Sequence, residues 1–318
     1  MKKLRIFWTG FQEKYSIILI LLLLIIISSI INPNFLSPAN LANVSRQVSV
    51  TVILAFGATI LIVCGLIDLS CGSVLALSGL LSVSVYKMTG SLVLAFPVAV
   101  LAGVMANLLS AVMVTKYRVP SFIATLAMLA MARGAALLYT RGQNIYQIEG
   151  YTVLGQGSIL GIPTPLIFLL IFLMITWYIL QHTKLGRSFF AIGGNENAAI
   201  ASGIHTDSCK IWAFVLNGFF VGVAGVLFMS RVNAGLPNAG IGYELHALTA
   251  AIIGGTSFSG GIGTAGGTAA GAFIVGFLNN IMNLANVNSY LQQVVRGLII
   301  ALAVIYDMRA RSKRETGS

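Results

Sequence analysis

Apolar segments of membrane-crossing length follow one another along almost the whole chain. We mark ten of them, at about Tyr15–Ile31, Val48–Ile67, Ser73–Tyr86, Leu92–Val114, Val119–Gly142, Thr164–Leu180, Trp212–Phe228, Leu245–Ile253, Ala269–Leu284 and Tyr290–Tyr306. A helix that spans a bilayer needs about 20 mainly apolar residues, so 318 residues allow about eight to ten spans. Only 8% of the residues are charged and the mean hydropathy is +0.92, which leaves no stretch for a separate soluble domain. We therefore predict one all-α integral membrane domain over residues 1–318.

The basic residues predict an orientation for these spans. With the N-terminus and C-terminus in the cytoplasm, 13 of the 19 lysines and arginines lie in internal segments, at Lys2, Lys3, Arg5, Lys14, Lys116, Arg118, Lys184, Arg187, Lys210, Arg309, Arg311, Lys313 and Arg314. Such a bias is the positive-inside rule, and it explains the net charge of +11 without a nucleic-acid partner. The first segment resembles a signal peptide, but it is long and no small-x-small site follows, so we expect an uncleaved span.

A polar segment over residues 183–208 separates two of the apolar spans. Within it, Asn195 is a favourable N-cap and Gly203 a favourable C′ residue, so NENAAIAS is predicted to form a short helix. Its small residues, Ala198, Ala199, Ala201 and Ser202, suit close docking into a groove on another protein. The alternative is a solvated loop whose charges only fix the orientation.

This segment also carries a family resemblance. GR-x-FFAIGGNENAA-x-x-SGI, from residue 186 to 204, is similar to the cytoplasmic coupling segment of ABC-importer permeases of the ribose and monosaccharide type. GYELHALTAAIIGGTSFSGG-x-GT, from residue 242 to 264, resembles the same family. Weaker similarity lies in GLIDLSCGS and in residues 119–142, where Leu66, Cys71 and Ser121 depart from the family pattern.

The resemblance implies the permease subunit of an ATP-driven importer of a sugar or sugar-like solute, multi-pass in the bacterial inner membrane. Its partners would be a cytoplasmic ABC ATPase, a periplasmic solute-binding protein and a second permease, identical or related. The chain itself would have no catalytic residue and no cofactor. The residues implied in ATPase coupling are Gly186, Arg187, Gly193, Gly194, Asn195, Glu196, Ala198, Ala199, Ser202 and Gly203.

Several polar residues lie in or near the spans and are candidates either for the solute pathway or for structural roles: Asp68, Arg133, Glu244, Asn279, Asn280, Gln292 and Arg296. For Asp68 we favour a structural role as N-cap of the next helix. Arg133 is a candidate for lining the pathway or pairing with Asp68, but for it we favour snorkelling or a structural pair. Amides can donate to and accept from sugar hydroxyls, but they serve interhelical hydrogen bonds equally well.

A glycine-rich stretch, Ile253–Gly271, contains GIGTAG, which matches the nucleotide-binding pattern G-x-G-x-x-G. Neither the strand before that pattern nor the acidic residue after it is present, and no lysine for a phosphate loop occurs between Lys210 and Lys313. The stretch instead predicts an interrupted or re-entrant helix. Gly263, Gly267 and Gly271 are expected to form a ridge for helix contact.

Two other classes of protein compete with the importer. An ion-coupled secondary transporter would favour several intramembrane acids and an inverted repeat, whereas only Asp68 and Glu244 lie near spans. A membrane-embedded enzyme would need a nucleophile–base or metal constellation. Glu244 and His246 lack a third metal ligand nearby.

Overall fold

The computed structural model describes residue 17 and residues 19–316, and most of them are helical. The elements after the short apolar helix Leu19–Ile31 are η1 (Pro33–Leu36), α2 (Pro38–Val63), α3 (Cys71–Thr89), α4 (Leu92–Thr115), α5 (Ser121–Thr140), α6 (Val153–Gln156), β1 (Ser158–Ile159), β2 (Ile162–Pro163), α7 (Thr164–His182), α8 (Lys184–Gly194), α9 (Glu196–Ala201), α10 (Thr206–Val232), α11 (Tyr243–Ile253), α12 (Ala265–Leu284) and α13 (Ser289–Thr316). The predicted first span and the four N-terminal basic residues lie wholly or partly outside the described residues.

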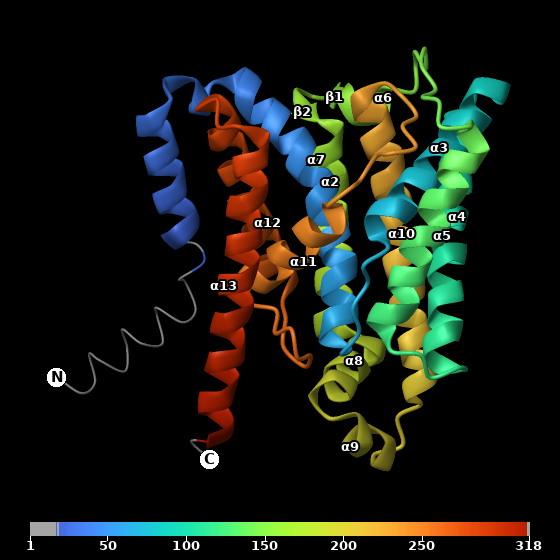
Figure 1. The fold of residues 1–318 in the computed structure, drawn as a ribbon, viewed down its shortest axis with the longest axis vertical. Helices are drawn as coiled ribbons and strands as arrows, with labels where there is room; N and C mark the ends of the chain where they lie inside the picture. The colour runs from blue at the N-terminus through green and yellow to red at the C-terminus, as the bar shows by residue number, and fades with distance from the viewer. Residues whose placement is uncertain (1–16, 18, 317–318) are drawn as a thin grey trace.

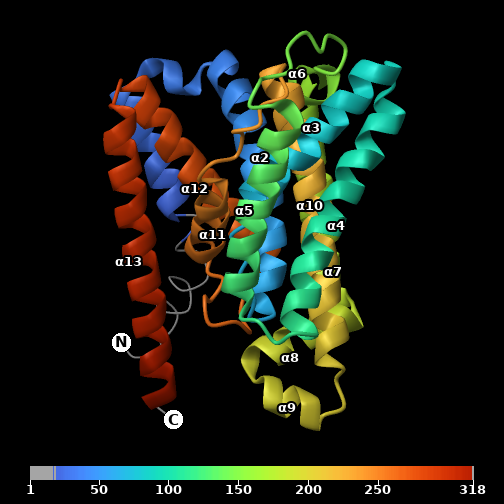
Figure 2. The ribbon, with the colours of Figure 1, turned by 45° about the vertical axis from the view of Figure 1, so that its right-hand side comes forward.

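Among the described residues, seven helices are long and apolar enough to cross a membrane: α2, α3, α4, α5, α7, α10 and α12. Helices α2 and α10 form the centre, and α10 packs against α2, α3 and α4. Helix α13 lies beside α11 and α12 in both views (Figure 1, Figure 2), and in Figure 1 the helix Leu19–Ile31 lies outside it. Figure 1 shows α8 and α9 at one end of the molecule and α6 with the β1–β2 hairpin at the other. The all-α prediction therefore holds apart from this small antiparallel hairpin.

The second span begins ten residues earlier than the apolar pattern suggested. The Ser37 side chain accepts a hydrogen bond from the Asn40 backbone N–H, and Pro38 occupies the first helical position. Both are local helix-start signals, and they extend the helix through the polar residues that follow. Arg46, which precedes the predicted span, consequently lies inside α2.

The predicted eighth span is too short to cross a bilayer. Helix α11 has 11 residues, which is a rise of about 17 Å. It ends at Ile253, the glycine-rich residues 254–264 follow without regular structure, and α12 then packs back against α11. The predicted interruption is therefore present, as a break between a half-length helix and a full-length one.

The predicted ridge contains two of its three glycines. Thr264 is the N-cap of α12, so Gly263 precedes the helix and contacts Val63 and Thr256 instead. A Cβ placed on Gly267 or Gly271 would overlap backbone carbonyl oxygens of Gly254 and Ala250, respectively. The two glycines thus let the backbones of α11 and α12 touch.

Candidate coupling surface and solute cavity

The segment implied in coupling folds as two helices, α8 and α9, joined at Asn195. The Asn195 side chain accepts a hydrogen bond from the Ala198 backbone N–H at 3.0 Å, so it caps α9 as predicted. At the other end, Gly203 has φ +81°, and the Gly203 and Ile204 N–H groups donate to the carbonyl oxygens of Ile200 and Ala199. This is a Schellman motif. The two caps fix a short helix that its length alone would not stabilise.

The residues implied in coupling divide into an exposed set and an inward set. Arg187, Gly194, Asn195, Ala198, Ser202 and Gly203 are exposed, and Ile200, on the same short helix, is 54% exposed. Ala199 is only 3% exposed, Gly186 is buried against the end of α7, and Gly193 is half-buried. The exposed residues are mostly small and lie on or next to α8 and α9, at the end of the molecule shown lowest in Figure 1.

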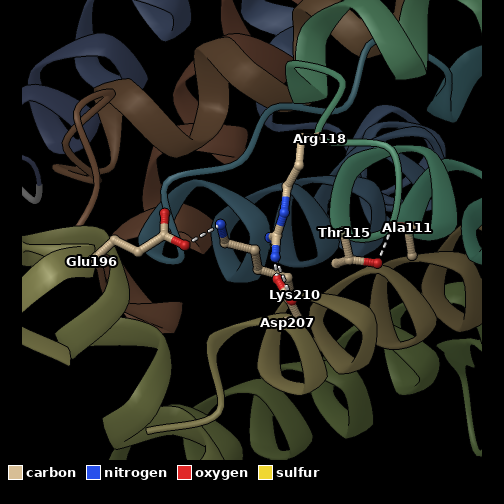
Figure 3. Close-up of polar contacts among 6 residues, drawn as sticks. All are labelled: Ala111, Thr115, Arg118, Glu196, Asp207 and Lys210. Atoms are coloured by element: carbon tan, nitrogen blue, oxygen red, sulfur yellow. Dashed lines mark hydrogen bonds and ion pairs between the residues drawn. The ribbon is translucent and has the colours of Figure 1, made fainter. Parts of the chain in front are cut away.

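Two ion pairs hold this end of the molecule together, and both involve the first turns of α10 (Figure 3). Lys210 donates to the Glu196 carboxylate at 2.6 Å, which ties α9 to α10. Arg118, in the loop between α4 and α5, donates to both oxygens of Asp207 at 2.6 and 2.9 Å. The Lys210 side chain is 12% exposed and that of Glu196 is 42% exposed. Glu196 therefore has an ion-pair partner within its own chain. The sequence analysis did not identify Lys210 as that partner.

A polar cavity of about 300 Å³ lies between α2, α11, α12 and α13. Side chains that line it include Gln47 and Thr51 of α2, His246 of α11, Asn279 of α12, and Gln293 and Arg296 of α13. A more apolar space adjoins it and shares His246, Asn279, Gln293 and Arg296. The structure thus brings together three of the polar residues predicted from sequence, because Gln292 also lines the cavity.

Some of the side chains that line the cavity are hydrogen-bonded to one another, whereas Asn279 has an oxygen that is not. Arg296 Nη2 donates to Gln292 Oε1 at 3.2 Å, and its Nη1 lies 3.3 Å from His246 Nε2. Gln292 Nε2 donates to Asn283 Oδ1 at 2.9 Å. Asn279 Oδ1 is buried and has no hydrogen-bond partner among the residues that the structure describes. None of the described residues that line the cavity is acidic, so the cavity presents amides and one fixed positive charge.

Other predicted polar residues have structural partners away from the cavity. Asn280 exchanges two hydrogen bonds with Asn40, at 2.9 and 3.0 Å, and so joins α12 to α2. Arg133 donates to the carbonyl oxygen of Pro237, and no ion pair with Asp68 is present among the described residues. Glu244 accepts a hydrogen bond from the Gly242 N–H at 3.2 Å.

Asp68 is not the N-cap that we favoured. Helix α3 begins at Cys71, and the Asp68 carboxylate accepts hydrogen bonds from the Ser70 N–H and Oγ, each at 2.6 Å. Asn217 of α10 donates to it at 2.6 Å and also to Asn107 of α4 at 2.8 Å. Asp68 is 3% exposed, so this cluster is a buried structural network between the α2–α3 loop, α10 and α4. The amides within otherwise apolar segments were its only sequence signal.

Comparison with known proteins extends these observations. Residues 40–304 match the family described as branched-chain amino acid transport system / permease component. The chain is 41% identical to the ribose import permease protein RbsC of Haemophilus influenzae, over 91% of each chain, and 41% identical to that of Bacillus subtilis, over 96% of each. It is 35% identical to the D-allose transport system permease protein AlsC of Escherichia coli, over 95% of this chain and 92% of that one. No solved structure matches it.

These matches favour the importer over the ion-coupled transporter, and they agree with a chain that carries no phosphate loop. ATP hydrolysis in such systems belongs to a separate subunit. The chain therefore belongs to this family of transport-system permease components, as a multi-pass inner-membrane subunit of an ABC importer.

Proposed function

We propose that this permease imports a neutral sugar, with ribose as the first candidate, through the cavity between α2, α11, α12 and α13. The family description names amino acids, whereas the relatives that match over nine-tenths of their length are named for ribose, allose and L-arabinose. The side chains that line the cavity support a sugar over an amino acid, because amides can both donate hydrogen bonds to hydroxyl groups and accept them. A charged amino acid would need a carboxylate for its ammonium group, and the described lining residues supply none.

Replacing Asn279 with leucine is expected to lower sugar uptake about tenfold, because the lining would lose a buried amide oxygen that has no hydrogen-bond partner among the described residues. Thermal stability of the purified permease should change little. Its neighbour gives the matched control: Asn280→Leu breaks the amide pair with Asn40 and should lower the melting temperature. Uptake of labelled sugar into proteoliposomes that contain the whole importer measures the first effect. Equal uptake by Asn279→Leu and the unmodified chain would contradict a pathway through this cavity.

The proposed importer has the ATPase docked on α8 and α9, a binding protein on the opposite face, and a second permease that completes the pathway. The exposed small residues of α9 support the docking site, since they let another backbone approach closely. The inner position of this end is supported by Arg118, Lys184, Arg187 and Lys210, which cluster there. The C-terminal end of α13 lies at the same end (Figure 1), in agreement with a cytoplasmic C-terminus.

Replacing Glu196 with lysine is expected to lower solute-stimulated ATPase activity of the assembled importer about fivefold or more. The change leaves the mostly buried Lys210 ammonium without its carboxylate and so releases α9 from α10. The charge-swapped chain, Glu196→Lys with Lys210→Glu, restores the pair and should recover most of the stimulation. Full stimulation in the single variant would exclude Glu196 from coupling. Failure of the swap would show that Glu196 contacts the ATPase directly.

A further inference from the structure

Three backbone segments that are far apart in the sequence meet beneath the coupling surface. The Gly261 N–H, in the loop between α11 and α12, donates to the carbonyl oxygen of Val63 at the end of α2, at 3.0 Å. Gly193, in the last turn of α8, packs against both groups. Gly260, the residue before Gly261, also lies against the backbone of Gly193. We name this contact of Val63, Gly193, Gly260 and Gly261 the glycine joint.

The glycine joint has no room for a side chain. A Cβ placed on Gly193 would overlap the Val63 carbonyl oxygen and lie 2.6 Å from the Gly261 nitrogen. A Cβ on Gly260 would lie 2.8 Å from the Gly193 oxygen. In both cases the obstacle is backbone, which cannot turn aside as a side chain does. By contrast, Gly266 in the first turn of α12 has nothing within 4 Å of the equivalent position.

The loop that contains Gly260 and Gly261 is itself fixed to the helices of the solute cavity. Gly254, at its start, touches the backbone of Gly267 and Gly271 in α12. Helix α11 before the loop contributes His246 to the cavity, and α12 after it contributes Asn279. A contiguous path of backbone contacts therefore runs from α8 through the loop to both helices. Contacts of this kind transmit a shift of less than 1 Å because no rotamer change can absorb it.

We infer that Gly193, Gly260 and Gly261 are positioning residues that transmit movement of the coupling segment to α11 and α12. Gly193 then acts behind the docking surface and not as part of it. This inference rests on the proposed docking of the ATPase to α8 and α9. It assigns the α11–α12 loop a role in energy coupling, whereas the resemblance placed that role only in residues 183–208.

The test compares Gly193→Ala with Gly266→Ala in the complete importer, with its ATPase and binding protein. Gly193→Ala is expected to keep the ATPase bound during size-exclusion chromatography but to raise the ATP hydrolysed per sugar imported about tenfold. Gly266→Ala should match the unmodified importer. A normal ATP-to-sugar ratio in Gly193→Ala would overturn the inference. Loss of ATPase binding would also overturn it, since Gly193 would then belong to the docking surface. Ordinary uptake with no ATPase bound would instead refute the proposed function.

A second measurement applies if Gly193→Ala does not assemble. Gly260→Ala disturbs the same contact from the side of the loop, because its Cβ would lie 2.8 Å from the Gly193 oxygen. Gly255→Ala is the matched control, since Gly255 has a similar φ (+84° against +90°) but its Cβ position is 3.7 Å from the nearest atom, in a side chain. Gly260→Ala is expected to raise the ATP hydrolysed per sugar imported about tenfold with the ATPase still bound, and Gly255→Ala should match the unmodified importer. Equal ATP-to-sugar ratios in these two variants would overturn the inference.

Discussion

Replacing Gly267 with leucine is expected to lower the free energy of unfolding of the purified permease by about 3 kcal/mol or more. The melting temperature falls accordingly. A Cβ at this position would overlap the Gly254 carbonyl oxygen and lie 2.7 Å from Thr264 Oγ1. The leucine therefore separates α11 from α12 and disturbs the N-cap that Thr264 provides. Overpacking in a core usually costs about 1–3 kcal/mol, and here the obstacle is a backbone that cannot relax alone.

The adjacent glycine is the matched control for this prediction. Gly266 is in the same helical turn with nothing within 4 Å of its Cβ position, so Gly266→Leu should melt within a few degrees of the unmodified chain. The measurement is thermal unfolding in detergent, followed by loss of the monodisperse peak. Equal melting of Gly267→Leu and Gly266→Leu would remove the packing role of Gly267.

Asp68→Leu should destabilise the permease by about 3 kcal/mol, through hydrogen bonds and not through volume. The substitution leaves the Ser70 N–H and Oγ, and one contact of the Asn217 amide, without an acceptor in the buried network. Asp68→Asn should cost much less, because it keeps an oxygen for Ser70 and the Asn217 amide can turn. The yield and melting temperature of folded protein distinguish the variants. If both melt equally low, the charge of Asp68 and not its hydrogen bonding is required.

The part of the fold that could be predicted is the part that depends on residues close together in the sequence. Helix α9 was expected because its determinants, Asn195 and Gly203, both act within one turn of the residues they cap. The start of α2 was missed although Ser37 and Pro38 are equally local, because the span was placed from its apolar residues, which begin at Val48. Helix α11 was assigned as a span from its hydropathy, whereas its length is limited by the glycines that follow Ile253.

Tertiary partners were the part that could not be predicted. Asp68 was assigned as an N-cap because its immediate neighbours allow one, but its position is determined by Asn217, which lies on α10. Asn279 and Asn280 are adjacent and chemically identical, yet one lines the cavity and the other pairs with Asn40. Only the rotation of α12 against α2 separates these roles. The sequence offers no pattern from which that rotation follows.

The glycine joint also has a consequence for biosynthesis. Its members come from the first quarter, the middle and the last quarter of the chain, so the coupling segment leaves the ribosome long before Gly261 does. Until α11, the loop and α12 are inserted, α8 lacks the backbone against which Gly193 packs. A permease truncated after α10 would thus contain the coupling segment but not the loop backbone against which Gly193 packs. With the ATPase docked on α8 and α9 as proposed, it would find this surface in place only on chains whose last helices are already inserted, so the importer would assemble after that step.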